Sequence, residues 1–344
     1  MTNKRVLVLG ATGAMATYLI PELLKKGYEV VGVSLEDVKS DNEKLTYIKA
    51  NALDMDFLKS QCEQKYDAIV DFMIYNSVSM FERYHKLFLD NTEHYIFFST
   101  YRVYAGDTPL TENSRRLLDI EKPDDFETEC EYSIYKAEEE DFLRNSAYKN
   151  YTIVRPAITY SKRRFQLTTL EANVLVYRML KGKTVVLPES AMKKQATMSW
   201  AGDVAKMLSA LILNPEAYTE TYTVSTAEHM TWEEVAKIYE EIGGLKYVTV
   251  DDDTYVDIVS GGSIYTKQQL VYDRCFDRIV DNSKILAISG LKQEDLMSLK
   301  EGLRCEFENV TLEMVGCHTQ ANERMDEYLK SIRGENKNES YTCQ

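Results

Sequence analysis

The sequence has few of the features that mark membrane, disulfide-rich or metal-binding proteins. No apolar run in its 344 residues approaches the roughly 20 that a membrane-spanning helix needs. The chain begins without a signal-peptide pattern, so we expect a cytoplasmic protein. Its six cysteines include no closely spaced pair, and its four histidines are dispersed. We therefore expect neither a disulfide framework nor a metal site.

Positive charge is also in deficit. The chain has 41 Lys and Arg against 55 Asp and Glu, which gives a net charge of −14. Such a balance disfavours general binding to nucleic acids or anionic membranes. Hydrophobic residues make up 44% of the chain, enough for a substantial core. The length suits one large domain with an appendage, or two domains.

An apolar segment, residues 6–9, runs directly into a turn that contains two glycines. The unbroken apolar run predicts a strand buried on both faces of a parallel sheet. Glycine lets a backbone turn tightly and approach a ligand, and the helix expected after the turn, ending near Lys26, would offer its N-terminal N–H groups to a pyrophosphate. The same pattern also closes ordinary strand–helix units. Candidate cofactor-binding residues in the turn are Gly10, Thr12, Gly13, Ala14, Met15 and Ala16.

The end of the next predicted strand, residues 28–33, bears on which dinucleotide binds. In dinucleotide-binding folds a carboxylate at this position binds the adenosine ribose, and its absence leaves room for a 2′-phosphate. Ser34 takes the position here and is a candidate cofactor contact. Glu36 and Asp37 follow it closely, while Lys39 offers a cation. The sequence therefore leaves both NAD and NADP open.

Strand-like and helical segments alternate through the first half of the chain. Further strands are predicted over 45–49, 67–73 and 95–99, and helices near 57–62, 78–89 and 132–144. This alternation is typical of an α/β fold with a doubly wound parallel sheet. Open sheets of this type bind ligands at the carboxyl ends of their strands.

Hydroxyl groups gather where the strand predicted over 95–99 ends. Ser99, Thr100 and Tyr101 stand there, and Tyr132 and Lys136 follow one helical turn apart on one face of the next helix. A cation beside a phenol favours the phenolate, so this pair is a workable general base. Each signal alone also has an ordinary explanation, as a Ser/Thr turn or as surface decoration of a helix.

Taken together, these three signals resemble the extended short-chain dehydrogenase/reductase family, in particular its NAD-dependent epimerase/dehydratase branch. Later segments extend the resemblance: VRP at 154–156, WAGDVA at 200–205, YTVS at 222–225, TWEEV at 231–235 and DNSK at 281–284. The resemblance covers about residues 4 to 310. It implies that Gly10, Gly13 and Ala16 line the cofactor pyrophosphate, that Ser99 lies at the cofactor, and that Thr100, Tyr132 and Lys136 are the catalytic residues.

The resemblance also implies a domain arrangement. A Rossmann-type NAD(P)-binding domain is expected over residues 1–160 with segments returning near 196–230, a smaller interleaved substrate-binding part over 161–195 and 231–333, and a frayed polar tail over 334–344. A basic run opens the substrate-binding part, where Arg163 and Arg164 are candidate contacts to the diphosphate of a nucleotide-linked substrate, although such runs are more often simply solvated. The connection between the fourth and fifth strands is short, so the homodimer interface that the family builds there stays open.

The implied function is an NAD(P)-dependent sugar epimerase acting on a nucleotide-sugar through a keto intermediate. Tyr132 would accept a proton from a sugar hydroxyl as hydride passes to the nicotinamide, Lys136 would hold the nicotinamide ribose, and Thr100 and Tyr101 would contact the substrate. Family dehydratases carry an Asp-Glu pair where this chain has Tyr101-Arg102, so we expect no dehydration.

Two other functions stay open. The first is an NAD(P)H-dependent reductase of keto-sugars or small carbonyl compounds, which would use the same residues. The second is a cofactor-binding family member that binds RNA or acts in regulation, against which the net charge of −14 argues.

Overall fold

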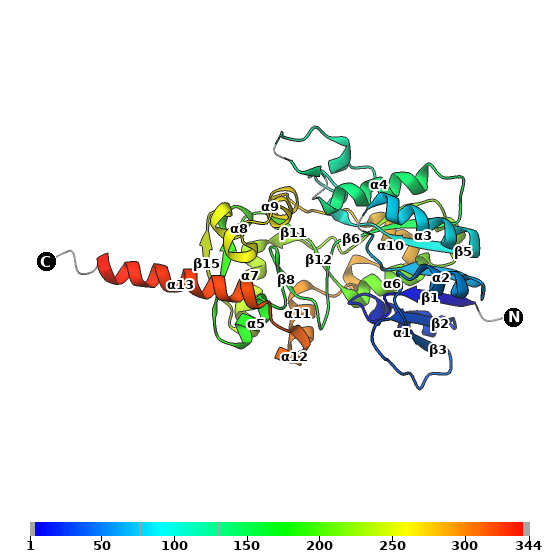
Figure 1. The fold of residues 1–344 in the computed structure, drawn as a ribbon, viewed down its shortest axis with the longest axis horizontal. Helices are drawn as coiled ribbons and strands as arrows, with labels where there is room; N and C mark the ends of the chain where they lie inside the picture. The colour runs from blue at the N-terminus through cyan, green and yellow to red at the C-terminus, as the bar shows by residue number, and fades with distance from the viewer. Residues whose placement is uncertain (1–3, 76, 125, 129–130, 340–344) are drawn as a thin grey trace.

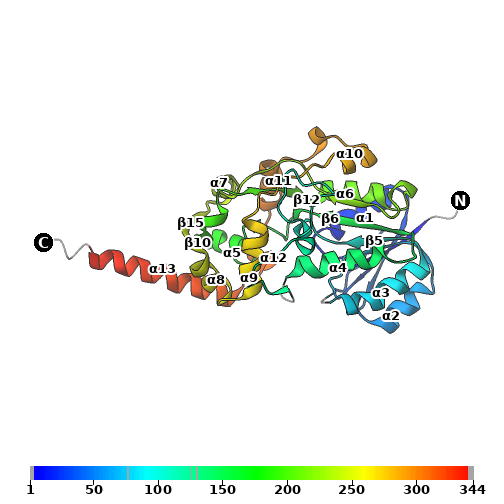
Figure 2. The same cartoon turned by 90° about the horizontal axis from the view of Figure 1, so that it is seen from above.

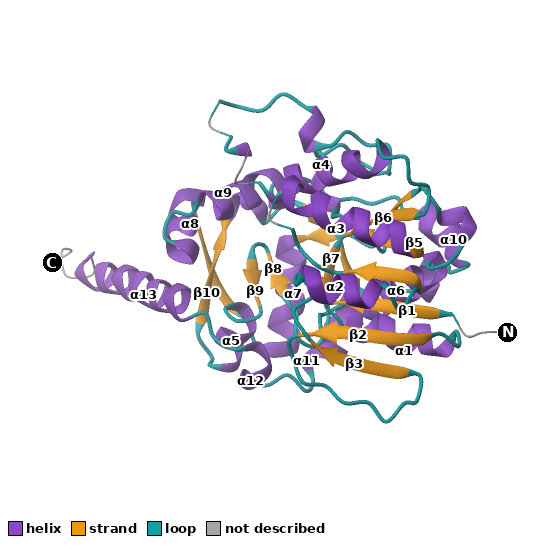
Figure 3. Cartoon of the chain, turned by 45° about the vertical axis from the view of Figure 1, so that its right-hand side comes forward, coloured by secondary structure: helices purple, strands orange, loops and turns teal. Residues whose placement is uncertain are grey.

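The computed structural model describes residues 4–75, 77–124, 126–128 and 131–339. Its centre is a seven-stranded sheet in the order β13-β6-β5-β4-β1-β2-β3, with every pair parallel (Figure 3). The strands are β1 (Arg5–Leu9), β2 (Glu29–Ser34), β3 (Leu45–Lys49), β4 (Tyr66–Asp71), β5 (Thr92–Phe98), β6 (Tyr151–Pro156) and β13 (Thr221–Val224). The predicted α/β doubly wound sheet is confirmed.

Helices cover both faces of this sheet (Figure 2). One face carries α1 (Ala16–Lys25), α6 (Ala201–Leu211) and α10 (Ser283–Ser289), and the other carries α2 (Met55–Cys62), α3 (Val78–Asn91) and α4 (Tyr132–Arg144). Side chains of β1 alternate between the two cores: Val6 and Val8 pack on the α1 side, Leu7 on the α2 side. Because both faces are buried, β1 is apolar from Val6 to Leu9.

A smaller part of the molecule lies at the other end of its long axis (Figure 1). It contains a parallel pair, β10 (Thr184–Pro188) and β15 (Lys246–Val250), surrounded by helices. The remaining elements are β8 (Gln166–Leu167), β9 (Leu170–Glu171), α5 (Leu175–Leu180), β11 (Gln195–Ala196), β14 (Met230–Thr231), α7 (Trp232–Gly243), α8 (Asp252–Ser260), α9 (Ile264–Gln269), α11 (Leu299–Phe307), α12 (Leu312–Val315) and α13 (Thr319–Glu339).

The chain crosses between the two parts more than once. After β6 it enters the smaller part through β7 (Ile158–Tyr160), which pairs in parallel with β12 (Met198–Trp200). It then returns through α6 to β13 at the edge of the main sheet. The polar tail predicted from residue 334 continues α13 to Glu339, and residues 340–344 lie outside the described part of the chain.

Among the described residues, no helix combines the length and the apolar character that crossing a membrane requires. No three of their His, Cys, Asp and Glu side chains gather in a way that could hold a metal ion.

Candidate functional site

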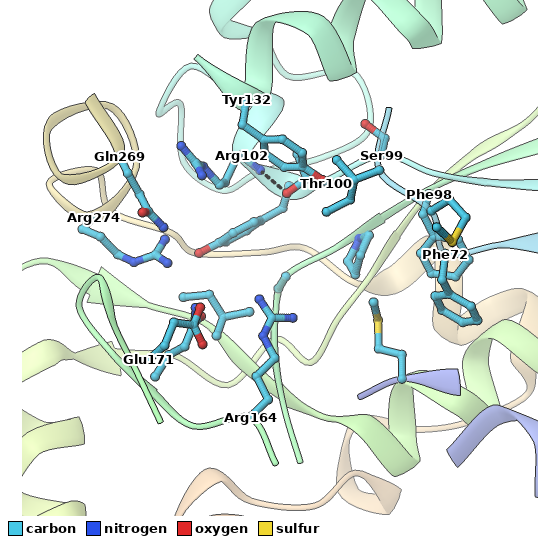
Figure 4. Close-up of a pocket in the computed structure, with 18 residues that line it drawn as sticks. Phe72, Phe98, Ser99, Thr100, Arg102, Tyr132, Arg164, Glu171, Gln269 and Arg274 are labelled. Carbon is cyan, nitrogen blue, oxygen red and sulfur yellow. Dashed lines mark hydrogen bonds between the residues drawn. The ribbon is translucent and has the colours of Figure 1, made fainter. Parts of the chain in front are cut away.

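Two cavities lie at the carboxyl edge of the main sheet, and the glycine turn contributes to both. The larger has a volume of about 410 Å³ and is lined by Met15 of the turn and by residues 99–102 at the end of β5. Its lining also contains Tyr132 and, from the smaller part, Arg164, Glu171 and Arg274 (Figure 4). The smaller cavity, about 170 Å³, is lined by Ala11, Thr12, Ala14, Thr17, Glu36, Val38, Tyr47, Ser161, Lys162 and Arg163.

The glycine turn fits a dinucleotide. Gly10 has a φ of +80°, in the left-handed region that favours glycine. The N–H groups of Gly10 and Ala11 both donate to the carbonyl oxygen of Val33, at 3.0 and 2.9 Å, which fixes the turn to the end of β2. Among the described side chains none caps α1, and the first turn of this helix carries no acidic residue. Its N-terminal N–H groups are therefore suited to an anionic ligand such as a pyrophosphate.

At the end of β2 the structure separates two candidates for the adenosine ribose. The Ser34 hydroxyl is buried, accepts a hydrogen bond from Glu36 N at 3.1 Å and donates to Glu36 O at 3.0 Å. This hydroxyl is thus engaged within its own turn. The Glu36 side chain is exposed and lines the smaller cavity. At this strand end the group that faces the cavity is therefore a carboxylate.

Ser99 and Thr100 end β5 with different partners. Ser99 Oγ donates to Glu140 Oε1 at 2.6 Å, and Thr100 Oγ1 accepts from Arg102 N at 3.2 Å (Figure 4). A hydroxyl that accepts a hydrogen bond from an N–H group can still donate one through its own hydrogen. Thr100 is thus equipped to donate a hydrogen bond into the larger cavity, whereas Ser99 is committed to Glu140.

Tyr132, the first residue of α4, is half-buried and faces the larger cavity. The guanidinium carbon of Arg102 lies 5.5 Å from the centroid of the Tyr132 ring, within the range of a cation–π contact. Arg102 is held there by Glu131, whose Oε1 accepts from Nη2 at 2.8 Å. A role for Arg102 beside Tyr132 was not expected from the sequence, where Arg102 stands only as a poor substitute for a dehydratase acid.

Lys136 lies behind the cavity rather than in its lining. Its side chain is 1% exposed, and Nζ donates to Glu139 Oε2 at 2.9 Å. Nζ also lies 4.7 Å from the centroid of the Phe97 ring. The structure therefore brings Thr100 and Tyr132 together at the larger cavity, while the ammonium group of Lys136 contacts a buried carboxylate.

Glu139 was not singled out from the sequence, where it looks like one of several acidic residues on a helix. In the structure it is buried, and its second oxygen, Oε1, has no hydrogen-bond partner within the described residues. Burial raises the pKa of Glu139 to about 7, although Lys136 acts in the opposite direction. Asp71 at the end of β4 raises this pKa further, and its own pKa is raised by burial.

Replacing Glu139 with glutamine should change how stability depends on pH. A carboxyl whose folded-state pKa is raised contributes stability at low pH that is lost as the pH rises, here between about 4.5 and 7. Over this range the variant should gain on the order of 3 kcal/mol in free energy of unfolding relative to wild type. Urea denaturation at pH 4.5 and pH 7 measures the difference.

The matched control is Glu138→Gln. Glu138 is exposed on the same helix, and of the groups that raise the pKa of Glu139 it contributes least, so this variant should keep most of the pH dependence of wild type. Equal pH dependence for Glu139→Gln and wild type would contradict the assignment of a raised pKa to Glu139.

A buried ion pair ties α4 to the main sheet. Arg155 at the end of β6 donates to both carboxylate oxygens of Glu140, at 2.8 Å from Nε and 2.6 Å from Nη2. Burial alone would raise the pKa of Glu140, but Arg155, Arg144 and the Ser99 hydroxyl hold it below its usual value. Because Ser99 precedes Thr100, this network ties the second half of α4 to the end of β5.

The wall of the larger cavity opposite Tyr132 carries two cations, Arg164 and Arg274, and one carboxylate, the exposed Glu171 (Figure 4). Arg164 is half-buried, and no ion-pair partner for it occurs within the described residues. Arg274 is buried and pairs with Asp273, which also contacts Arg278 at 3.0 Å and Arg102 at 3.5 Å. Burial lowers the pKa of Arg274 and lowers that of Arg278 to about 10. Arg102 also pairs with Glu131, so three guanidinium groups share two carboxylates, Asp273 and Glu131. With Arg164 and Glu171 counted, four guanidinium groups face three carboxylates, and this small excess of positive charge suits an anionic ligand.

The basic run predicted to meet the substrate divides between the two cavities. Arg164 lines the larger one, whereas Arg163 lines the smaller one, where its Nη1 lies 3.9 Å from Glu36 Oε1. Tyr101 lies in the lining of the larger cavity, with the guanidinium carbon of Arg278 5.2 Å from its ring centroid.

Comparison with solved structures finds the same architecture in known epimerases. An epimerase from Methanothermobacter thermautotrophicus has a TM-score of 0.66 and 15% identity, over 96% of this chain and 95% of that one. The UDP-glucose 4-epimerase of Thermotoga maritima, solved with UDP-glucose, has a TM-score of 0.63 and 18% identity, over 88% and 97%. The UDP-glucuronic acid 4-epimerase of Bacillus cereus, solved with UDP-glucuronic acid and NAD, has a TM-score of 0.64 and 16% identity, over 88% and 98%. Identities this low show a shared fold.

Sequence comparison is more decisive about the family. No curated protein sequence matches the chain. The model of the NAD dependent epimerase/dehydratase family matches residues 6–225, which is more than half of the chain and contains the glycine turn, Thr100 and Tyr132. The resemblance seen in the sequence is confirmed, and the chain belongs to the NAD-dependent epimerase/dehydratase family.

Proposed function

We propose that this enzyme is an NAD-dependent epimerase of a nucleotide-linked sugar. The observation that carries the proposal is the larger cavity, which has Tyr132 and Thr100 on one wall and Arg164 and Arg274 on the other. Such a cavity can hold a sugar hydroxyl at the phenol while a diphosphate contacts the arginines. The three solved epimerases support it by their common fold, two of them with UDP-sugars bound.

Tyr132 and Thr100 act on the sugar hydroxyl that is oxidised. When bound, the cofactor supplies the hydride acceptor and donor. The Tyr132 phenolate oxygen takes the hydroxyl proton, so that no free alkoxide develops, and returns it when the keto sugar is reduced again. Thr100 donates a hydrogen bond to the reacting oxygen. Arg102 lies over the Tyr132 ring, with its guanidinium carbon 5.5 Å from the ring centroid, and this cation–π contact helps to hold the ring at the cavity.

The cofactor is held by the turn and by the end of β2. Gly10, Gly13 and the uncapped start of α1 take the pyrophosphate. The Glu36 carboxylate accepts a hydrogen bond from the adenosine ribose and would repel a 2′-phosphate, which favours NAD over NADP.

Dehydration is disfavoured by the chain's own residues. Neither Tyr101 nor Arg102 supplies the carboxylate that would protonate a leaving hydroxyl. Arg102 is moreover held in place by Glu131, at 2.8 Å.

The test has two stages. Thermal shifts with UDP-, GDP-, CDP- and dTDP-sugars, each with NAD or NADP, identify the substrate and cofactor that stabilise the protein. The enzyme is then incubated with that sugar nucleotide in deuterated water, and the product is analysed by mass spectrometry and NMR. We expect a stereoisomer of unchanged mass with no net reduction of cofactor. A 4-keto-6-deoxy product carrying deuterium would instead indicate dehydration, and net consumption of reduced cofactor would indicate a reductase.

A further inference from the structure

The turn that follows β7 brings residues from the smaller part of the molecule onto the glycine turn. Ser161, Lys162 and Arg163 line the smaller cavity together with Thr12 and Ala14. The turn is held in shape by two backbone hydrogen bonds, from Ser161 N to Arg164 O at 3.0 Å and from Arg164 N to Ser161 O at 2.9 Å. The cavity of about 170 Å³ therefore has one wall from each part.

Ser161 carries a buried hydroxyl without a partner. The residue is 1% exposed, and its Oγ makes no hydrogen bond to any of the residues described in the structure. A buried hydroxyl left unpaired is costly, and native proteins pair most such groups with protein, water or ligand. Across the same cavity lies the start of α1, which no described side chain caps. Both walls thus offer donors suited to an anion between them.

The positive charge of the 161–163 turn also suits an anionic ligand. Lys162 and Arg163 are exposed at the cavity in a protein whose net charge is −14. Arg163 has only a weak partner, because its contact of 3.9 Å with Glu36 joins side chains that are 55% and 58% exposed. Its guanidinium can move to a phosphate or ribose oxygen at little cost.

We propose that the 161–163 turn is the second wall of the dinucleotide site, where Ser161 Oγ donates a hydrogen bond to a pyrophosphate oxygen and Arg163 contacts the adenosine ribose beside Glu36. The proposal rests on the NAD cofactor of the proposed function. It adds that the cofactor is bound by the smaller part of the molecule as well as by the glycine turn. The same turn reaches the substrate through Arg164 in the larger cavity, so one short segment contacts both ligands.

The test is calorimetric titration of the full-length protein, freed of cofactor, with NAD and with ADP-ribose, which keeps the adenosine and pyrophosphate but lacks nicotinamide. Ser161→Ala should weaken the affinity for both ligands by the same factor, about tenfold to a hundredfold, since the lost bond is to a charged oxygen. Arg163→Gln should weaken both by roughly threefold to tenfold, with a smaller effect at high salt. Exposed-residue controls, Ser60→Ala on α2 and Arg304→Gln on α11, should bind as wild type does.

A stability measurement separates ligand contact from a structural role. Because the Ser161 hydroxyl has no protein partner among the described residues, Ser161→Ala without ligand should unfold in urea at the wild-type midpoint or above it. Unchanged affinity of Ser161→Ala for NAD and ADP-ribose would overturn the proposal, as would a loss confined to NAD or a failure of the wild-type protein to bind NAD. If the expected affinity losses appear but no nucleotide sugar is turned over, the proposed epimerase function is wrong, whereas the assignment of the 161–163 turn to the dinucleotide site is supported.

Discussion

Replacing Tyr132 with phenylalanine will lower turnover by about 10²–10⁴-fold while leaving the affinity for NAD within twofold of wild type. The substitution keeps the aromatic ring and its contact with Arg102, 5.5 Å from the ring centroid, and removes only the phenol oxygen. That oxygen is the proton acceptor in the proposed reaction, whereas the proposed cofactor contacts lie in the glycine turn, at the end of β2 and in the 161–163 turn. The measurements are kcat with the sugar nucleotide found by thermal shift, and calorimetric titration with NAD.

Tyr135→Phe is the control. Tyr135 stands on the same helix with its ring centroid 5.3 Å from that of Tyr132, in an edge-on contact, but it is not among the residues lining the larger cavity. Its turnover should stay close to that of wild type. Near-normal turnover in Tyr132→Phe would refute the role given to Tyr132, whatever the substrate proves to be.

Replacing Glu140 with alanine will lower the free energy of unfolding by about 3–5 kcal/mol, because it leaves the Arg155 guanidinium buried without its bidentate partner. Arg155 is 1% exposed and cannot recover solvent contact without moving β6. A loss of this size is a large share of the 5–15 kcal/mol that is typical of folded domains. Urea denaturation measures it.

The effect should also depend on pH, with a definite sign. Because the pKa of Glu140 is held below its usual value in the folded protein, its contribution is complete above about pH 5 and is lost as the pH falls. The difference in free energy of unfolding between Glu140→Ala and wild type should therefore become smaller as the pH falls below about 5. Glu138→Ala, at an exposed position on the same helix, should change stability by less than about 0.5 kcal/mol. A similar small change in Glu140→Ala would contradict the importance given to the buried pair.

Much of the main sheet was predictable because its signals are local. The strand predicted over 45–49 and the helix predicted over 132–144 coincide with β3 and α4. The fifth strand begins earlier than predicted, at Thr92 rather than near residue 95. Its first residues are polar and do not predict a strand. His94 is nevertheless buried there, and both of its ring nitrogens have partners: Nε2 lies 2.8 Å from Thr152 Oγ1, and Nδ1 accepts from Leu213 N at 2.9 Å. Such partners, far apart in the sequence, are brought together only by the fold.

The candidate site also combines residues that the sequence indicates with residues that only the fold brings together. The glycine turn, Thr100 and Tyr132 belong to short patterns whose chemistry is visible in the sequence. Asp273 and Arg274 belong to no such pattern. They join the site only because the fold brings them to Arg102, which is more than 150 residues away in the sequence. Nor does sequence show that the neighbours Arg163 and Arg164 would face different cavities, since this depends on the turn that carries them.

The return of the chain to the main sheet has a consequence for how the protein is made. The strand β6 ends at Pro156, but its outer edge is covered by β13, and one face of the sheet by α6 and α10, which ends at Ser289. A ribosome that has released the first 160 residues has therefore supplied every strand but one, while the helices that cover this face beside α1 are still to be synthesised. Until they arrive, the nascent sheet presents an unpaired strand edge and bare apolar side chains to the cell. A fragment that ends near residue 160 would lack β13, α6 and α10, so it would keep this strand edge and these apolar side chains exposed.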